Sequence, residues 1–191
     1  MIYNYYFGPI KNNNKNIPDT LIYKTIKQDK NTKQLYEHYT AFNKNGKITG
    51  IIDGYMETIR PLVGDPFFPG FKKKKSFYVY YIRSKEHNFG NKLLDFAQIT
   101  SKKKGGEGRF HLIASDRYNI KKKPHIFYRK YGMNSLYTEA IRDIDKYIKG
   151  KIKLDDLELT DIPMYFIPEE LKKKSKIFPN IINKLLSFIK K

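Results

Sequence analysis

Residues 76–97 read SFYVYYIRSKEHNFGNKLLDFA and join a run of strand-forming residues to an amphipathic segment through a polar turn. Ser76 to Ile82 is a run of aromatic and β-branched residues, the composition of a strand buried on both faces. From Asn91 to Lys102 apolar residues recur at helical spacing, and Gly105 and Gly106 follow where a helix C-terminus is expected. The stretch therefore predicts a central strand followed directly by a helix.

A further strand and helix follow this segment. Arg109 to Ser115 reads RFHLIAS, another buried-strand pattern, so the sequence predicts a strand–helix–strand unit whose two strands run parallel. Pro124 is typical of the first turn of a helix, and Gly132 is typical of a helix C-cap. We expect the inward face of this second helix to carry Ile126, Phe127, Tyr128 and Tyr131.

The flanking sequence predicts mainly antiparallel strands. The expected strands are Ile2 to Phe7, Leu21 to Ile26, Gln34 to Phe42, Ile48 to Ile59 and Pro163 to Pro168. Asn43 to Gly46 contains residues that tolerate positive φ and indicates a hairpin. Residues 60–75 contain three prolines and two glycines, which favour a loop, whereas residues 139–150 show helical spacing.

Together these elements predict an α/β (α+β) fold with one mixed, mainly antiparallel sheet of six or seven strands flanked by helices. We expect one domain over residues 1–170, because a chain of 191 residues suits a single domain. Residues 171–191 have a basic amphipathic pattern that predicts an extra C-terminal helix. Its first interpretation is a helix docked on the domain, with a peripheral membrane helix or a partner-binding tail as alternatives.

The composition excludes several kinds of chemistry. The chain has no cysteine, which excludes disulfides, thiolate metal sites and cysteine nucleophiles. No apolar run approaches the ~20 residues of a transmembrane helix, and the first residues lack a signal-peptide pattern, so we expect a soluble, cytoplasmic protein. The four histidines lack metal-ligand spacing, so we expect no metal and ordinary structural roles for them. They are His38, His87, His111 and His125.

The net charge of +19 raises the question of nucleic acid binding. Six of the 38 basic residues are arginine, the residue best suited to bidentate contacts with bases and phosphates. The lysines accompany many Asn, Ile and Tyr residues, a composition that indicates AT-rich codon usage. We therefore do not expect nucleic acid as the partner, although a non-catalytic basic binding module, associated with nucleic acid or the ribosome, stays as the alternative interpretation.

The polar turn from Lys85 to Gly90 has the features of an anion site. A turn between a buried strand and a helix directs backbone N–H groups and the positive end of the helix dipole at one place. Asn88 is a residue type that accepts positive φ, and Gly90 allows a ligand to approach the backbone because it has no Cβ. The turn therefore indicates a phosphate-binding role.

Two segments resemble motifs of the GNAT superfamily of N-acetyltransferases. The family's Arg/Gln-x-x-Gly-x-Gly/Ala motif stands here as Lys85-Glu86-His87-Asn88-Phe89-Gly90, and its Phe-Tyr-x-x-x-Gly-Phe signature as Phe127-Tyr128-Arg129-Lys130-Tyr131-Gly132-Met133. The resemblance covers residues 35–168, and Lys85, Asn88 and Met133 depart from the family pattern. The N-terminal third has no room for the two helices that many members place there, which leaves the acceptor side undefined.

The resemblance implies transfer of an acetyl group from acetyl-CoA to an amine in a ternary complex. It implies a central strand that splits from its neighbour, with backbone groups of Tyr78, Val79 and Tyr80 holding the pantetheine arm. Pyrophosphate would lie at Lys85 and at the amides of Glu86, His87, Asn88, Phe89, Gly90 and Asn91. Asn119 matches the asparagine that contacts pantetheine, and Lys122 and Lys123 would add positive charge. The implied partner is a small-molecule or protein amine, and the chain could form a homodimer.

The resemblance also assigns Tyr128 as the general acid that protonates the leaving thiolate. A phenol is protonated at neutral pH, so it can donate a proton there. The alternative is that Tyr128 is a core aromatic residue. The general base stays open between Ser115 with Asp116, which follow Ala114, the carboxylates Asp53 and Glu57, and a chain of water molecules.

Overall fold

The computed structural model describes residues 2–3, 20–59, 73–87, 89–116 and 123–171. They contain one sheet of seven strands in the order β1-β2-β3-β4-β5-β6-β7. The strands are β1 (Ile2–Tyr3), β2 (Leu21–Gln28), β3 (Leu35–Phe42), β4 (Ile48–Ile59), β5 (Lys74–Ser84), β6 (Phe110–Ala114) and β7 (Ile162–Phe166). Neighbouring strands run antiparallel except β5 and β6, which run parallel. The predicted mixed, mainly antiparallel sheet is confirmed.

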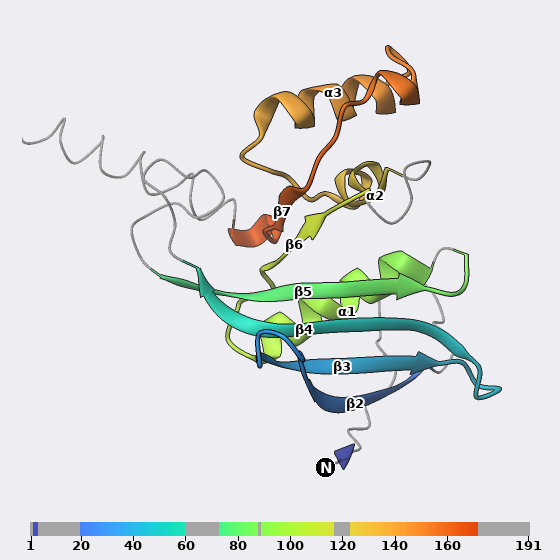
Figure 1. The fold of residues 1–191 in the computed structure, drawn as a ribbon, viewed down its shortest axis with the longest axis vertical. Coiled ribbons are helices and arrows are strands. Elements are labelled where there is room, and N and C mark those ends of the chain that lie inside the picture. Colours follow the sequence, from blue (N-terminus) through green and yellow to red (C-terminus); the bar gives the residue numbers. More distant parts are fainter. Residues whose placement is uncertain (1, 4–19, 60–72, 88, 117–122, 172–191) are drawn as a thin grey trace, which may run out of the picture.

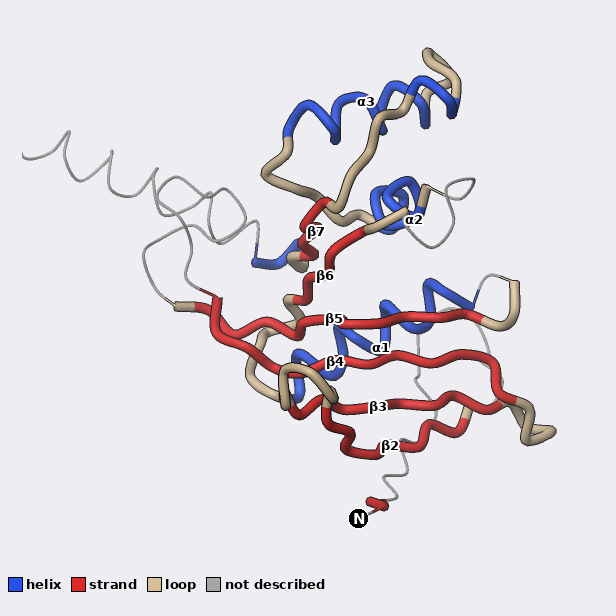
Figure 2. The backbone as a smooth tube through the Cα atoms, viewed as in Figure 1, coloured by secondary structure: helices blue, strands red, loops and turns tan. Residues whose placement is uncertain are grey.

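The described helices follow β5 and β6 in the chain. They are α1 (Phe89–Lys103), α2 (Pro124–Tyr131), α3 (Thr138–Ile148) and the short 3-10 helix η1 (Leu154–Asp156). α1 packs across β4 and β5 and lies behind them in Figures 1 and 2, and α3 packs on α2. Among the described helices, none lies over the opposite face of β2 to β5, which faces the viewer in Figure 1. We call this second face the open face.

The hairpin between β3 and β4 forms where the sequence predicts it. The Asn43 Oδ1 atom accepts hydrogen bonds from the backbone N–H groups of Asn45 (3.0 Å) and Lys47 (3.1 Å). Gly46 has φ 73°, a conformation that glycine adopts without steric cost. The local side-chain hydrogen bonds and this glycine therefore set the turn that brings β3 and β4 into register.

α1 begins at Phe89, two residues before the predicted start, because the Phe89 side chain joins the buried stripe of the helix. The stripe also contains Leu93, Leu94, Phe96 and Ala97. The helix ends before Gly105, whose φ of 79° matches the predicted C-terminus. The Phe96 ring meets Tyr39 of β3 at 4.9 Å between ring centroids, so the hydrophobic core lies between α1 and the sheet.

β5 differs from the predicted strand in length and burial. It begins at Lys74, so the end of the predicted loop 60–75 belongs to the strand. Phe77 and Val79 are buried, but Tyr80 is 54% exposed and Tyr81 is 43% exposed. The prediction of burial on both faces is therefore wrong for the second half of the strand. The physical reason is that β6 pairs with the first half alone.

α2 packs beside α1 through its tyrosines. Tyr128 is buried, and the Tyr131 hydroxyl donates a 2.7 Å hydrogen bond to Asp95 of α1. Phe127, predicted to face inward, is 36% exposed, so that part of the prediction is wrong. Three consecutive residues of a helix point in different directions, and the inward positions of α2 belong to Tyr128 and Tyr131.

Some predicted elements lie wholly or partly outside the described residues. β1 contains Ile2 and Tyr3 of the strand predicted for residues 2–7, and the remaining residues of that strand are not described. The C-terminal helix predicted for residues 171–191 falls on residues 172–191, which are also outside the described part. Within the described residues, the structure contains no helix with the length and apolarity needed to span a membrane.

Candidate functional site

The sheet splits between β5 and β6. In the described chain these strands pair over three positions, from Phe77 opposite Phe110 to Val79 opposite Leu112. Beyond that point β6 stays paired with β7 as far as Ala114, and β5 stays paired with β4 as far as Ser84. The split implied by the family resemblance is therefore present, and beyond it β5 pairs with β4 alone among the described strands.

A β-bulge lies at the point where the split begins. Gly54 of β4 is opposite Val79, but Asp53 is opposite Tyr81, so Tyr80 is the extra residue of the bulge. A Cβ atom on Gly54 would lie 2.6 Å from Cζ of Phe77 and still closer to the Tyr78 carbonyl oxygen. Glycine at this position therefore allows the close approach of β4 and β5, and the bulge redirects β5 just where it leaves β6.

The three strand residues predicted to hold pantetheine have different surroundings. Val79 directs its side chain into the core, so it can offer backbone groups alone. Tyr78 is half-buried, and its ring centroid lies 5.3 Å from that of Tyr55. Tyr80 is exposed, with its ring 5.7 Å from Tyr36 and its hydroxyl 3.4 Å from the Asp29 carboxylate. Tyr78 and Tyr80 therefore place aromatic rings beside the split.

The predicted phosphate turn connects β5 to the N-terminus of α1. Lys85 donates a backbone hydrogen bond to Thr49 O (2.8 Å), and the Ser84 hydroxyl donates one to Glu86 O (2.5 Å). Lys85, Glu86, His87 and Asn91 are exposed. The first turn of α1 contains no acidic residue, so no side chain there offsets the positive end of the helix dipole. Asn88 is outside the described residues.

Phe89 and Gly90 have structural roles at this turn that the sequence did not indicate. The Phe89 side chain is buried in the core, and its amide lies 3.3 Å from Glu86 O, so Phe89 is a weaker candidate for phosphate binding than predicted. A Cβ atom on Gly90 would lie 2.8 Å from Cζ of Phe127. The space that glycine leaves open is thus taken by an α2 side chain, and Phe127 links the two motifs.

Tyr128, the predicted general acid, is buried beside Phe127, with 5.3 Å between the ring centroids. Burial raises the pKa of Tyr128 to about 12, so the phenol keeps its proton at neutral pH. Among the described residues, no hydrogen-bond partner of its hydroxyl is found. The phenol therefore keeps a proton that no acceptor among the described residues takes up.

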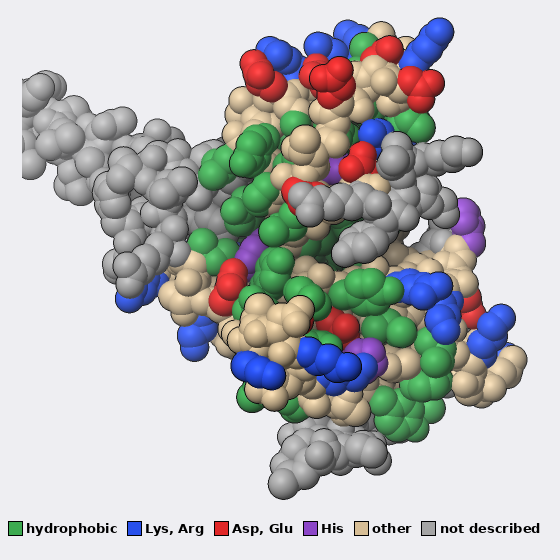
Figure 3. Space-filling view, viewed as in Figure 1, with side chains coloured by type: hydrophobic (Ala, Val, Ile, Leu, Met, Phe, Trp, Pro, Cys, Tyr) green, Lys and Arg blue, Asp and Glu red, His purple; other side chains and the backbone are tan. Residues whose placement is uncertain are grey.

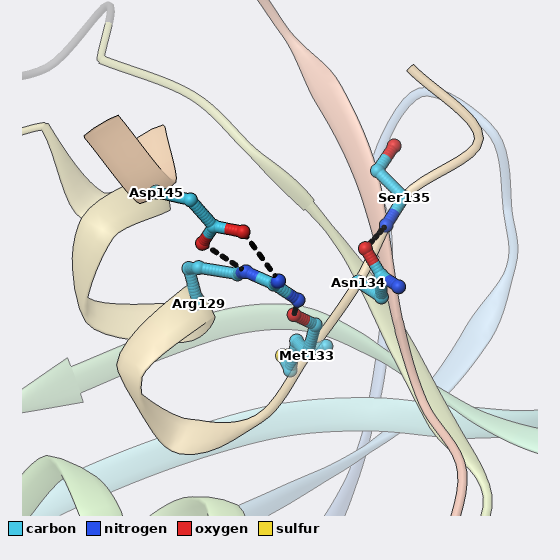
Figure 4. A network of polar contacts seen from close by, with 5 residues as sticks. All are labelled: Arg129, Met133, Asn134, Ser135 and Asp145. Atoms are coloured by element: carbon cyan, nitrogen blue, oxygen red, sulfur yellow. Dashed lines mark hydrogen bonds and ion pairs between the residues drawn. The ribbon is translucent and has the colours of Figure 1, made fainter. Parts of the chain in front are cut away.

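A polar network holds the C-terminus of α2 in place (Figure 4). The Arg129 guanidinium forms two 2.7 Å hydrogen bonds with the Asp145 carboxylate of α3 and a third, of 3.3 Å, with Met133 O. Gly132 has φ 104° and caps the helix, as predicted, and Met133 is fully buried. Asn134 exchanges two backbone hydrogen bonds with Tyr165 of β7. These contacts set the position of the helix that carries Tyr128.

Two of the candidates near residues 114–123 are paired with each other. Lys123 Nζ lies 2.9 Å from the Asp116 carboxylate. This neighbour lowers the pKa of Asp116, so Asp116 is a poor general base, and Lys123 is not the free cation that the sequence predicted. Ser115 is partly buried, and Ala114 has no acid–base group. Asn119 and Lys122 lie outside the described residues.

Two histidines form carboxylate pairs on the open face. His111 Nε2 lies 2.6 Å from Glu57 Oε1, and His111 Nδ1 lies 2.8 Å from the Ser76 hydroxyl. His38 Nδ1 lies 2.5 Å from Asp53 Oδ1. The partners are 54 and 15 residues apart in the sequence, so no local motif marks them. The prediction of ordinary roles for these two histidines missed both pairs.

The other two histidines lie elsewhere. His87 is exposed in the turn before α1, and His125 is buried with its Nε2 atom 2.8 Å from Thr160 O. Burial lowers the pKa of His125, so it is neutral at physiological pH. Neither contacts the pairs on the open face, and His125 fits the structural role that the sequence predicted.

An aromatic row crosses the open face at the start of the split. The rings of Tyr55, Tyr78, His111 and Tyr165 follow one another from β4 to β7, with centroid distances of 5.3, 5.1 and 5.7 Å. Figure 3 shows this side of the molecule, with acidic, histidine and hydrophobic side chains next to one another. The open face therefore carries histidine–carboxylate pairs among aromatic rings at the start of the split.

Comparisons with known proteins found structural similarity alone, because no family model and no curated protein matches this chain. A GNAT family acetyltransferase from Staphylococcus aureus Mu50 is 16% identical with a TM-score of 0.37, and the match covers 68% of this chain and 66% of that one, just under two thirds. A bacterial toxin is 9% identical with a TM-score of 0.46, and the match covers 78% of this chain and 91% of that one.

A third similar structure is a mutant of the toxin AtaT bound to the C-terminus of the antitoxin AtaR and to acetyl-CoA. It is 10% identical with a TM-score of 0.40, and the match covers 75% of this chain and 72% of that one. The order of the strands and helices and the split between β5 and β6 agree with the fold that the sequence resemblance to the GNAT family implies.

Proposed function

We propose that this chain is an N-acetyltransferase that transfers an acetyl group from acetyl-CoA to an amine. The observation that carries the proposal is the coincidence of three features: β5 leaves β6 after Val79, Tyr80 is bulged out of register, and α1 begins shortly after β5 ends. The result is a free strand edge that leads to the N-terminus of a 15-residue helix. An amide-containing arm with a pyrophosphate at one end fits such a site.

The strand edge suits the pantetheine arm. Backbone groups of β5 that face away from β4 after Val79 have no strand partner in the described residues, so they can hydrogen bond to the amides of a bound ligand as a neighbouring strand would. The N-terminus of α1, with exposed Lys85 and His87 before it, would bind the pyrophosphate through backbone N–H groups and the helix dipole.

The buried phenol suits the leaving group. When an amine attacks the thioester carbonyl, the C–S bond breaks and the sulfur requires a proton. Tyr128 holds one at neutral pH, and the contacts of α2 with α1 and α3 keep the ring in a defined position. Tyr128 thus acts as the general acid in this proposal.

The alternative function is a non-catalytic basic binding module, which the net charge of +19 favours. It would bind nucleic acid or a ribosomal surface with a steep dependence on salt concentration. The split between β5 and β6, and a Tyr128 hydroxyl with no hydrogen-bond partner among the described residues, have no role in that function, so we favour the acetyltransferase.

Thermal unfolding with ligands tests the proposal. At about 100 times its Kd, acetyl-CoA adds about 2.7 kcal/mol to the stability of the folded state, so we expect Tm to rise by several degrees. ATP at the same concentration is the matched control, because it carries adenine and phosphates without the pantetheine arm. Unchanged melting with millimolar acetyl-CoA and CoA would contradict the proposal. Binding to RNA that weakens steeply between two salt concentrations would then support the alternative.

A further inference from the structure

We propose that Glu57 is the general base that removes the proton from the acceptor amine, and that His111 and Ser76 position its carboxylate. This inference rests on the proposed acetyl transfer and adds its missing acid–base partner. It follows from the contacts among these three residues and from their place beside the split.

The three side chains form one consistent hydrogen-bond chain. An ionised Glu57 can only accept, so His111 Nε2 carries the proton and donates it to Oε1 over 2.6 Å. His111 Nδ1 then accepts from the Ser76 hydroxyl over 2.8 Å. Ser76 and His111 are buried, whereas the Glu57 side chain is 37% exposed. The buried residues therefore fix one oxygen of the carboxylate, and the exposed remainder is free to meet a substrate.

The position of this chain relative to the split singles it out from the second pair. Ser76 is on β5 and His111 on β6, the two strands that separate, and His111 lies opposite Tyr78, one residue before the pairing ends. His38 is on β3, so β4 and β5 lie between it and β6. The Asp53 side chain is 11% exposed, which leaves little of its carboxylate for a substrate.

The surroundings of Glu57 suit a cationic amine. The titratable groups that face it are Tyr55 on β4, Tyr78 on β5 and His111 on β6, which in turn stacks on Tyr165 of β7. The phenols carry no charge at neutral pH, so the carboxylate is the one negative group among these residues. Aromatic faces and a carboxylate together favour an alkylammonium group.

The reaction step balances with these residues. The acceptor enters as an ammonium ion and loses one proton through Glu57 to solvent. Its nitrogen lone pair then attacks the thioester carbonyl carbon, so a C–N bond forms and the C–S bond breaks. The second nitrogen proton is far more acidic once the C–N bond has formed, so it passes to water, and the sulfur takes the Tyr128 proton. Solvent reprotonates Tyr128, so the products are an amide, CoA and one proton.

Two small amines of similar size test the base. Ethylamine is protonated at neutral pH, whereas 2,2,2-trifluoroethylamine is mostly unprotonated, so the second depends much less on a base. The full chain is assayed with acetyl-CoA and each amine by release of free thiol, which a chain without cysteine allows without background. We expect Glu57→Gln to lower ethylamine turnover by roughly 10²–10⁴-fold and trifluoroethylamine turnover far less. Asp53→Asn, the matched change in the second pair, separates the two candidates, and we expect it not to reproduce this difference between the two amines.

Other results would overturn the assignment. An equal loss with both amines would show that Glu57 has a structural role, and an Asp53→Asn loss that depends on the amine would transfer the base to the second pair. If the wild-type protein binds acetyl-CoA but acetylates neither amine, that result would contradict the placement of the acceptor amine on the open face. A chain that does not bind acetyl-CoA at all contradicts the proposed function itself, before any variant is compared.

The role of His111 has its own readout. A positioning residue acts through Glu57, so His111→Ala should reduce ethylamine turnover more than trifluoroethylamine turnover, with a smaller loss than Glu57→Gln. The thermal shift caused by acetyl-CoA should persist in both variants, because neither residue contacts the strand edge proposed for the donor. A His111→Ala variant with full ethylamine turnover would overturn the positioning role.

Discussion

The two halves of β5 have nearly the same composition and opposite surroundings. From Ser76 to Val79 the strand lies between β4 and β6, with Phe77 and Val79 buried under α1. From Tyr80 to Ser84 it pairs with β4 alone and exposes two tyrosines. Aromatic side chains in the first half exclude water from the core, whereas in the second half they line a free edge. The difference teaches that one strand can supply both stability and a binding edge, with the bulge at Tyr80 as the boundary.

The largest effect is expected on turnover, from a change at Tyr128, the proposed general acid. Tyr128→Phe removes the proton proposed for the leaving thiolate, so we expect kcat to fall by roughly 10²–10⁴-fold. The ring is retained and its hydroxyl has no partner among the described residues, so the free energy of unfolding should change little. Steady-state kinetics and urea unfolding of the same variant measure the two quantities. A stable variant with undiminished turnover would leave Tyr128 as a core aromatic residue.

In the first half of β5, from Ser76 to Val79, we expect substitutions to reduce the free energy of unfolding. Phe77 is fully buried, so Phe77→Ala leaves a cavity and should reduce the free energy of unfolding by about 3–5 kcal/mol. Tyr81→Ala is the matched change in the second half of β5, from Tyr80 to Ser84. We expect it to reduce the free energy of unfolding by less than about 1 kcal/mol. Urea unfolding of both variants provides the comparison. Similar losses would show that the two halves do not differ in their contribution to folding.

The boundary itself can be tested at Gly54. Its missing Cβ would overlap the Phe77 ring and the Tyr78 carbonyl oxygen, which belong to the backbone and core and cannot move aside easily. We expect Gly54→Ala to cost about 1–3 kcal/mol and to weaken acetyl-CoA binding, because β5 must shift at the bulge. In Gly50→Ala, the control, the nearest atoms to the added Cβ belong to the side chains of Leu93 and Phe89 and not to the backbone, so the cost should be smaller. Equal costs in calorimetry would contradict a special role for the bulge.

The smallest effect is expected away from both halves, at the link between α2 and α3. Arg129 lowers the pKa of Asp145, so this pair stabilises the fold above the unfolded carboxyl pKa of ~3.9 and loses its contribution as pH falls below that value. Both side chains are partly exposed, so Asp145→Asn should cost about 0.5–1 kcal/mol at pH 7 and nothing near pH 2. Unfolding curves at the two pH values check this. A loss that persists at low pH would contradict an electrostatic origin.

Local patterns were sufficient for most of the elements. The hairpin at Asn43 to Gly46 and the caps at Gly105 and Gly132 depend on backbone conformations that these residue types adopt without strain, so they could be predicted position by position. The helices and strands follow from hydrophobic periodicity. The burial of β5 and the direction of the Phe127 side chain could not be predicted from hydrophobic periodicity alone, because they depend on where β6 and α1 lie.

The candidate site also contains residues that the sequence predicts and residues that only the folded structure brings together. The turn from Lys85 to Gly90 and the tyrosine of α2 belong to motifs that are contiguous in sequence, so both could be predicted as site candidates from the sequence. The link between Glu57 and His111 joins β4 to β6 across β5, over 54 residues, and depends on strand register. Contiguous residues determine turns, caps and periodic faces through local sterics and hydrogen bonds. Tertiary structure alone decides which distant side chains meet, because that requires the whole sheet to form in one register.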